Sequence, residues 1–324
     1  MYFKKLLNPE LYQGRKKKKS YFEGWYYKLV SQDEKLTLAL IPGISKSLND
    51  PHAFIQVFMS SNILGSLTLK TFYNRFETHD FSYQDDPFSI KIGNNIFSKT
   101  YVSLDIKVEG LSIKGKVNIS SRTPLKKSIW MPNIMGPFGY LNFMECYHGV
   151  VSMNHMLNGT LQLNGSPVIF NESKGYIEKD WGKSFPRAYV WLQSNHFNRK
   201  DTSLMFSYAD IPFLGFYFKG LIAVLTYQGK EYRFATYNRA RIKKEDIKER
   251  YASYILKKGK YLLEIEASSE NEIALASPKQ GEMINQIKEG LSGKINIKLF
   301  EKQRLIYEDT GYHAGIEIMK KKAS

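Results

Sequence analysis

The sequence predicts an all-β protein made of antiparallel strands, with few short helices. Residues 102–108 alternate apolar and polar side chains, and the alternation resumes over 111–119 after Gly110, which is typical of a hairpin. Asn164-Gly165 and Gln228-Gly229 stand between further alternating segments, and both pairs suit tight turns. The sequence has no strand–helix–strand rhythm and no glycine-rich phosphate loop, which argues against nucleotide chemistry.

Short segments of strand character recur along the chain at regular spacing. Two short charged segments, 243–250 and 279–290, have a helical pattern instead. Many short strands separated by turn residues are typical of barrels and sandwiches. The remaining strands are expected near residues 36–41, 54–60, 66–73, 87–92, 188–194, 203–208, 260–267, 294–300 and 314–319.

The length of 324 residues exceeds what one compact core usually organises, so two domains are expected. A polar break at residues 171–173 places their boundary near residue 170. The predicted domains are an N-terminal barrel of residues 1–170 and a C-terminal barrel of residues 171–324.

The net charge is +16, and part of it lies in one basic run: Arg15, Lys16, Lys17, Lys18 and Lys19. Such a run attracts nucleic acid or an anionic membrane surface. The sequence contains no helix-turn-helix, zinc-finger, KH or RRM signature, so no nucleic-acid partner is expected. A lipid headgroup suits the run better, in a peripheral contact with an anionic membrane. Lysines scattered elsewhere are expected to form an ordinary solvated surface.

Compartment and metal content are also predicted from the sequence. One cysteine excludes an intrachain disulfide and fits a reducing compartment. The first residues lack the apolar core of a signal peptide, and no window approaches the ~18–20 apolar residues of a membrane span. The sequence therefore predicts a cytoplasmic protein. None of the six histidines has the short paired spacing of a zinc or iron site, so no metal is expected.

Residues 174–197 combine the residue types of a reactive site. Strand alternation places Glu178 and Asp180 on one face of a strand, close to Trp181. The following strand carries three more large or polar side chains on one face: Tyr189, Trp191 and Gln193. An acid beside aromatic faces in an apolar site can protonate carbon or hold a cation. The alternative is an ordinary strand whose acids face water and whose tryptophans fill a core.

Other acid chemistries fit these residues less well. The sequence contains no GxSxG motif, and the polar residues that a glycosidase needs for sugar binding are missing. Two carboxylates that share an apolar cavity favour keeping one of them protonated, which is what alkene protonation requires.

The segment 174–197 is similar to the tocopherol cyclase family. Family members carry an EKxWG motif, then FPR, then an aromatic-rich strand with a glutamine. This chain has EKDWG at 178–182, FPR at 185–187 and WLQ at 191–193. Residues 21–28, YFEGWYYK, resemble the opening motif of the family, and the stretch from Ala276 to GIEI at 315–318 resembles its ending.

The resemblance implies two lipocalin-like antiparallel β-barrels, an architecture shared with carotenoid hydratases. It also implies an intramolecular cyclase with no redox cofactor and a lipophilic substrate held in a barrel lumen. An acid protonates a prenyl double bond, and a phenol oxygen then closes a chromanol ring. Glu178 takes the place of the motif acid. The other residues assigned to this site are the catalytic Asp180, Glu23 and Tyr189, the cation-stabilising Trp25, Trp181 and Trp191, and the substrate-binding Tyr27 and Gln193.

Two features depart from the family pattern. The family usually has Asn where this chain has Asp180, which is either a second acid or a neutral replacement. The first half is shorter than in photosynthetic members, which indicates a different or shorter substrate. Two alternatives stay open. One is a lipocalin-like carrier of a hydrophobic molecule, with its carboxylates in solvent or in salt bridges to Lys179 or Arg187. The other is a pair of closed barrels that aromatic side chains fill completely.

Overall fold

The computed structural model describes residues 2–63, 66–213 and 215–320. These residues form mostly strands, with one short α-helix, α1 (Tyr2–Leu7), and four 3-10 helices: η1 (Gly14–Lys16), η2 (Thr78–Asp80), η3 (Gly136–Tyr140) and η4 (Thr236–Asn238). The chain divides into two compact units. The first contains the residues up to Phe185 together with Ala276–Gln286, and the second contains Pro186–Leu275 and the residues from Ile287 onward.

The first unit contains one antiparallel sheet in the order β4-β3-β2-β1-β11-β10-β9-β8-β7-β6-β5. Neighbouring strands of the sheet are consecutive along the chain except for β1 and β11, whose pairing joins the first and last strands of this sheet. The strands are β1 (Tyr21–Val30), β2 (Leu36–Lys46), β3 (His52–Ile63), β4 (Ser66–Phe76), β5 (Phe81–Asp85), β6 (Phe88–Ile92), β7 (Asn95–Ser98), β8 (Tyr101–Val108), β9 (Leu111–Ser120), β10 (Cys146–Leu163) and β11 (Ser166–Gly182).

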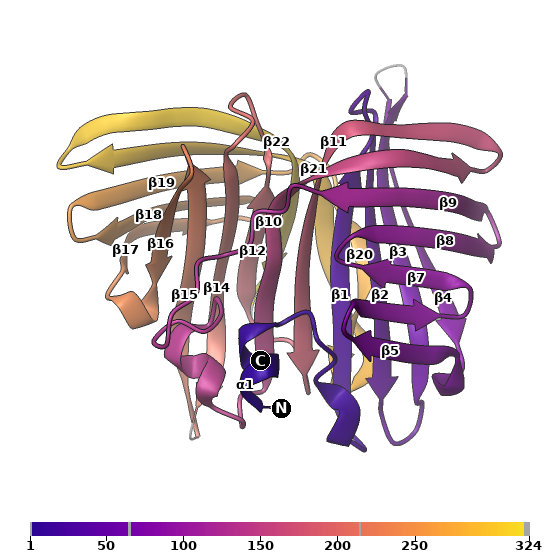
Figure 1. Cartoon of the computed structure of the whole chain (residues 1–324). Coiled ribbons are helices and arrows are strands. Elements are labelled where there is room, and N and C mark those ends of the chain that lie inside the picture. Colours follow the sequence, from indigo (N-terminus) through magenta and orange to yellow (C-terminus); the bar gives the residue numbers. More distant parts are fainter. Residues whose placement is uncertain (1, 64–65, 214, 321–324) are drawn as a thin grey trace. The chain divides into compact units, whose positions relative to one another are not determined.

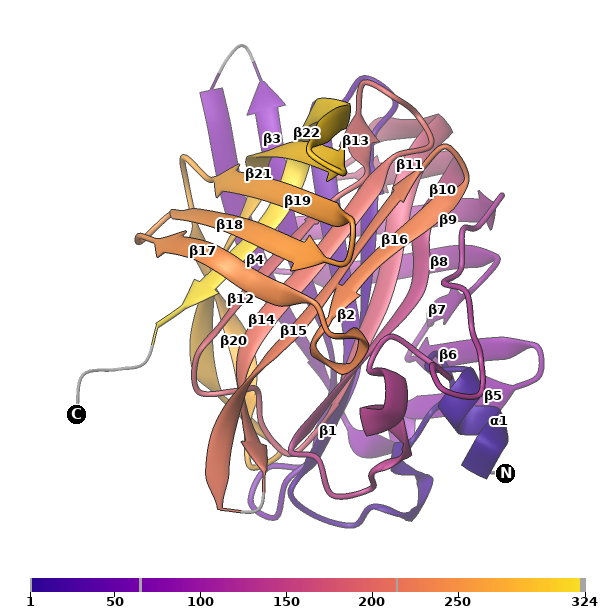
Figure 2. The same ribbon diagram turned by 90° about the vertical axis from the view of Figure 1, so that its left-hand side faces the viewer.

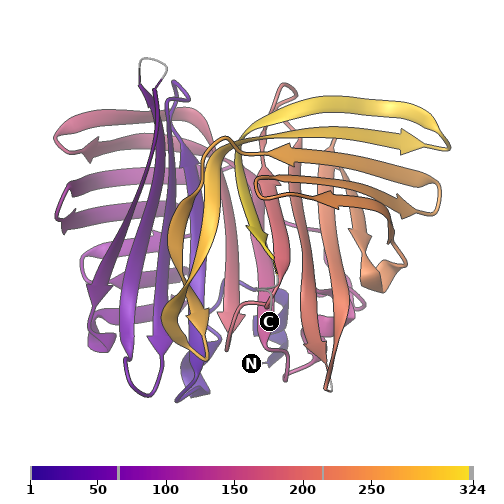
Figure 3. The same ribbon diagram turned by 180° about the vertical axis from the view of Figure 1, so that it is seen from behind.

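This sheet bends over on itself. In Figure 1, β1 to β4 run upright and β5 to β9 cross them, and Figure 3 shows the same strands from behind. The bend brings β3 close to β6 and β4 close to β8. Apolar side chains from both layers fill the space between them, including Trp25, Ile55 and Phe97. The core of the first unit therefore lies inside the bent sheet.

A second sheet, most of which belongs to the second unit, has the order β16-β15-β14-β12-β22-β21-β19-β18-β17, with β13 paired to β22 and β20 paired to β21. Residues 276–279 of β20 and 282–286 of β21 belong to the first unit. Figure 2 shows β17, β18 and β19 crossing in front of β14 and β15, with a second apolar core between the layers. The strands are β12 (Tyr189–Ser194), β13 (His196–Phe197), β14 (Ser203–Phe213), β15 (Phe216–Tyr227), β16 (Lys230–Ala235), β17 (Arg241–Ile247), β18 (Tyr251–Lys258), β19 (Tyr261–Ser268), β20 (Ile273–Lys279), β21 (Glu282–Glu301) and β22 (Arg304–Met319).

The predicted all-β class is confirmed, and each predicted strand and hairpin corresponds to an observed one. The two predicted helices are wrong. Residues 243–247 lie in β17 and residues 282–290 lie in β21. Strand β17 is at the edge of its sheet, where charged side chains are common because they discourage pairing with another chain. An edge strand of this kind lacks the clean alternation that identifies a strand.

The predicted boundary near residue 170 falls inside β11. The polar residues 171–173 lie at an irregularity in this strand, where Glu172 has a φ of 52° and the pairing with β10 shifts. The chain passes from the first unit to the second at Phe185 and Pro186, and it returns to the first unit for Ala276–Gln286. No helix formed by the described residues has the length and apolar character needed to cross a lipid bilayer.

Candidate active site

The EKDWG motif occupies the end of β11, between β1 and β10, and strand alternation divides it between two faces of the sheet. Glu178 lies opposite Tyr26 of β1, and Asp180 lies opposite His148 of β10. Lys179 lies opposite Trp25, a core residue of the first unit. Neighbouring residues of one motif therefore take part in two separate clusters.

The first cluster is built around His148. Its Nδ1 atom lies 2.8 Å from Oδ1 of Asp180, and its Nε2 atom lies 3.4 Å from Oε2 of Glu178. The hydroxyl of Tyr176 donates to the same Oε2 of Glu178 over 2.5 Å. The two carboxylates share one face, as the alternation predicts, and the imidazole ring joins them.

This cluster is shielded from water to different degrees along its length. The side chain of Glu178 is 5% exposed and that of His148 is 14% exposed, whereas Asp180 is 26% exposed. Burial, together with the adjacent Glu178, raises the pKa of Tyr176 well above its usual value, so this phenol keeps its proton and acts as a donor. The acid at the buried end, Glu178, therefore has two partners and little contact with solvent.

The second cluster lies on the opposite face and is built around a buried ion pair between Lys179 and Glu23. Neither side chain has exposed surface. The ammonium group of Lys179 also donates to the carbonyl oxygens of Pro9 at 2.9 Å and Leu11 at 2.6 Å. The carboxylate of Glu23 accepts from the backbone N–H of Gly14 and from Gln13, both at 2.8 Å, and from the hydroxyl of Tyr21 at 2.6 Å. The pair thus anchors the N-terminal segment on the sheet.

The indole rings of Trp25 and Trp181 belong to this second cluster. The ammonium nitrogen of Lys179 lies 4.7 Å from the ring centre of each. Burial lowers the pKa of Lys179 to about 8, and the attraction of Glu23 opposes this effect. Both tryptophans, which we predicted would stabilise a substrate cation, therefore contact a cation of the protein itself.

Gly182 ends the motif for a steric reason. Its φ is 149°, and a Cβ atom at this position would meet the carbonyl oxygen of Glu145 and the Cα atom of Cys146. Both are backbone atoms at the start of the neighbouring strand, so they cannot move aside as a flexible side chain could. The motif glycine therefore permits the close approach of β11 to the start of β10.

The structure places the other predicted site residues in three further settings. Tyr27 is buried in the core of the first unit, and its hydroxyl donates to the carbonyl of Ser98 over 3.2 Å. In the second unit, the hydroxyl of Tyr189 donates to Glu317 over 2.6 Å. Trp191 and Gln193 are buried in the same unit. The site roles of all these residues stay predictions.

Two residues of the His148 cluster were missed by sequence reasoning, namely His148 itself and Tyr176. The alternation of β11 could have identified Tyr176. This residue precedes Glu178 by two positions, so both side chains lie on the same face of the strand. His148 is harder to find. Counting back from the Asn164-Gly165 turn would place Gly149 opposite Asp180, but irregularities along β10 shift the pairing by one residue.

The donor atoms of this cluster also fit a metal ion. His148, Glu178 and Asp180 each offer one ligand atom, and these atoms lie within 4.8 Å of one another. Three nitrogen and oxygen ligands are the usual protein contribution to a catalytic zinc site. The spacing of the sequence motif did not reveal this group, because the histidine comes from the other strand of the hairpin.

This is an all-β protein of two bent antiparallel sheets, and the sheet of the first unit carries the cluster of His148, Glu178 and Asp180. Solved structures share this fold. A structure of CghA with Sch210972 matches with a TM-score of 0.61 and 8% identity, over 94% of this chain and 89% of that one. Kievitone hydratase from Nectria haematococca matches with a TM-score of 0.52 and 11% identity, over 93% and 88%. A Nitrosomonas europaea protein described as AttH matches with a TM-score of 0.52 and 13% identity, over 92% and 93%.

The sequence itself identifies the family. The tocopherol cyclase-like family model matches residues 133–319, which is more than half of the chain, so this chain belongs to that family. The matched region contains His148, the EKDWG motif and the FPR segment. No curated protein matches this chain in sequence.

Proposed function

We propose that this chain is an enzyme that protonates a carbon–carbon double bond of a lipophilic substrate, with Glu178 as the acid. One observation carries the proposal: the carboxyl group of Glu178 is buried between the hydroxyl of Tyr176 and the Nε2 atom of His148. An alkene is a weak base, and a carboxyl group that is shielded from water is a suitable donor to it. Membership of the tocopherol cyclase-like family supports this assignment.

The proposed reaction converts a prenylated hydroquinone into a chromanol. The proton of the Glu178 carboxyl forms a C–H bond with one alkene carbon, and a tertiary carbocation forms at the other. The phenol oxygen of the same molecule then forms a C–O bond to this cation. The phenol proton returns to Glu178 through His148. The product is an isomer of the substrate, so the reaction consumes no oxidant or redox cofactor.

His148 and Asp180 position and resupply the acid in this scheme. A carboxylate accepts hydrogen bonds, so the contact at 2.8 Å has Nδ1–H of His148 donating to Asp180. A neutral ring then presents the lone pair of Nε2 to Glu178 at 3.4 Å, and in the proposed reaction one proton is shared between the two groups. Asp180 is the more exposed end of the cluster, which gives the shared proton a connection to solvent.

The proposal is tested by incubating the purified protein with a prenylated hydroquinone in deuterated buffer. The expected product is an isomer that contains one new C–D bond. Glu178→Gln should lower turnover at least about a hundred-fold, because general acid catalysis contributes ~10²–10⁴. Glu172→Gln is the matched control, since Glu172 is exposed on the same strand. Both variants should unfold at the denaturant concentration of the wild type.

Three results would contradict the proposal. Wild-type turnover in Glu178→Gln would remove this residue as the acid. A product that is heavier by one water molecule would show that the protein adds water to the double bond and does not close a ring. If the substrate is unchanged while native mass spectrometry detects a tightly bound lipid, the protein is a carrier of a hydrophobic molecule.

A further inference from the structure

We propose that one end of the first unit docks on an anionic membrane surface and holds an anionic lipid headgroup in a cleft beside Trp181. The proposal concerns where the protein binds, and it does not depend on the reaction proposed above. It rests on three observations: a cationic cleft, a rigid attachment of the basic run, and exposed apolar side chains on the same end of the unit.

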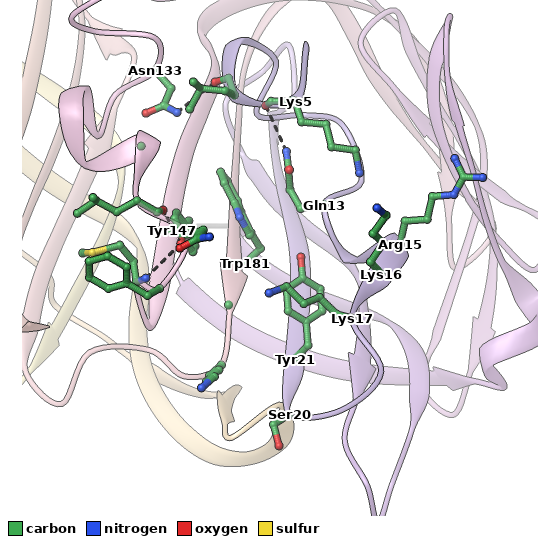
Figure 4. Close-up of a pocket in the computed structure, with 18 of the residues that line it drawn as sticks. Lys5, Gln13, Arg15, Lys16, Lys17, Ser20, Tyr21, Asn133, Tyr147 and Trp181 are labelled. Carbon is green, nitrogen blue, oxygen red and sulfur yellow. Dashed lines mark hydrogen bonds between the residues drawn. The ribbon is translucent and has the colours of Figure 1, made fainter. Parts of the chain in front are cut away.

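The cleft has a volume of about 660 Å³, and Figure 4 shows the side chains around it. One wall is aromatic, with Trp181 stacked on Tyr147 at a ring distance of 5.4 Å and an interplanar angle of 6°. None of the described residues that line the cleft is an Asp or a Glu. Its positively charged lining residues are Lys5, Arg15, Lys16, Lys17, Lys19 and Lys183.

The basic run is held in place by the buried Glu23 and the half-buried Lys46. The carboxylate of Glu23 accepts from the N–H of Gly14 at 2.8 Å, and Lys46 donates to the carbonyl oxygens of Gly14 at 2.8 Å and Lys17 at 3.0 Å. The charge of Glu23 is balanced by its ion pair with Lys179. The cationic side chains of residues 15–19 are exposed, so they remain available to an external anion.

Apolar side chains are exposed next to this cleft. On α1, Phe3 is 68% exposed, and on the segment between β9 and β10, Trp130 is 76% and Phe143 55% exposed. The amide of Asn133 donates to the carbonyl oxygen of Leu6 over 3.1 Å, which joins this segment to α1. Figure 1 shows α1 and the segment at the same end of the unit. Phe143 also lines the cleft itself.

These features together favour a membrane over other anionic partners. A lipid surface offers phosphate groups to lysine side chains and acyl chains to aromatic ones, and tryptophan is enriched at that depth. A free phosphate would use only the cleft and leave Phe3 and Trp130 in water. A nucleic acid would match the charges, but it offers no apolar layer for these side chains.

The test measures binding to vesicles of neutral phosphatidylcholine, with and without added phosphatidylserine. We expect binding to the anionic vesicles and much weaker binding to the neutral ones. The triple variant Lys16→Gln, Lys17→Gln, Lys19→Gln should weaken binding about a hundred-fold, at ~1 kcal/mol for each charge. The matched control carries Lys91→Gln, Lys107→Gln and Lys114→Gln, three exposed lysines on β6, β8 and β9. It has the same net charge as the triple variant and should bind like the wild type.

A second measurement tests the apolar contact. Tryptophan emission should shift to the blue on binding to anionic vesicles, and Trp130→Ala should weaken vesicle binding and remove most of this shift. If the two triple variants weaken vesicle binding equally, binding depends only on the overall charge of the protein, and the proposal is overturned. Binding of inorganic phosphate or of a short RNA without binding to vesicles would also overturn it. Loss of turnover with vesicle binding intact would contradict only the proposed reaction.

Discussion

Glu23 on β1 and Lys179 on β11 form an ion pair in which neither side chain has any exposed surface. The register sets them diagonally across the two strands, with Glu23 opposite Trp181 and Lys179 opposite Trp25. Their remaining polar atoms are bonded to the backbone of residues 9–14. The pair therefore connects the two aromatic sequence motifs to each other and to the N-terminal segment.

Removing one partner of this pair should destabilise the protein strongly. Lys179→Met leaves the carboxylate of Glu23 buried without its ammonium partner, at a cost of about 3–5 kcal/mol in the free energy of unfolding. The double variant Glu23→Leu, Lys179→Met should cost less than the sum of the two single changes. Urea denaturation measures the free energy of unfolding of Lys179→Met, Glu23→Leu and the double variant. Lys298 and Glu308 form an exposed pair, and Lys298→Met should change stability by less than about 1 kcal/mol. A similarly small effect of Lys179→Met would mean that this pair is not an anchor.

Asp180→Asn should lower turnover without abolishing it. An amide oxygen can still accept from Nδ1–H of His148, but this neutral hydrogen bond is weaker by about 1 kcal/mol, which corresponds to about five-fold. Asp180→Leu removes the acceptor and should lower turnover further. Rate measurements under saturating substrate, with unfolding midpoints as a check on folding, distinguish the two variants. Equal turnover of wild type, Asp180→Asn and Asp180→Leu would exclude a positioning role for Asp180.

Zinc should inhibit the proposed reaction. The ligand atoms of His148, Glu178 and Asp180 lie within 4.8 Å of one another, so a bound zinc ion would occupy the carboxylate that carries the proton in that reaction. We expect turnover to fall as zinc is added and to recover with a chelator. His148→Gln should weaken this inhibition. A chelator that abolishes turnover of the untreated enzyme would instead indicate a metal-dependent reaction.

His155 should make the protein less stable in acid. Burial, together with the positive charge of Arg122, lowers the pKa of His155 to about 3, from 6.5 in an unfolded chain. The unfolded state therefore binds more protons between these two values, and stability falls as the pH falls through 6.5 toward 3. This group alone should remove about 2 kcal/mol between pH 7 and pH 5.

Comparison of two variants isolates this contribution. His155→Gln should reduce the loss of stability between pH 7 and pH 5 by about 2 kcal/mol relative to wild type. His79→Gln should leave the loss unchanged, because the side chain of His79 is 82% exposed. An identical pH dependence in wild type and His155→Gln would show that folding does not lower the pKa of His155.

The sequence predicted more of the fold than of the candidate site. Hairpins such as 102–119 were found because alternation and turn residues are local properties. The helix predicted at 243–250 failed because a charged strand at a sheet edge resembles a polar helix. The segment 279–290 instead contains the turn between β20 and β21, where Gln280 and Gly281 have positive φ. Of the candidate site, alternation predicted that Glu178 and Asp180 share a face, but it said nothing about His148.

The sequence by itself determined the all-β class, the family and the pairing of acids in the EKDWG motif. Tertiary structure alone decided the partner of each motif residue. Irregularities in β10 shift the pairing by one residue, so that His148 instead of Gly149 lies opposite Asp180. A shift of one residue exchanges the two faces of a strand. Such a shift depends on how the whole sheet bends around its core, which no local pattern in the chain encodes.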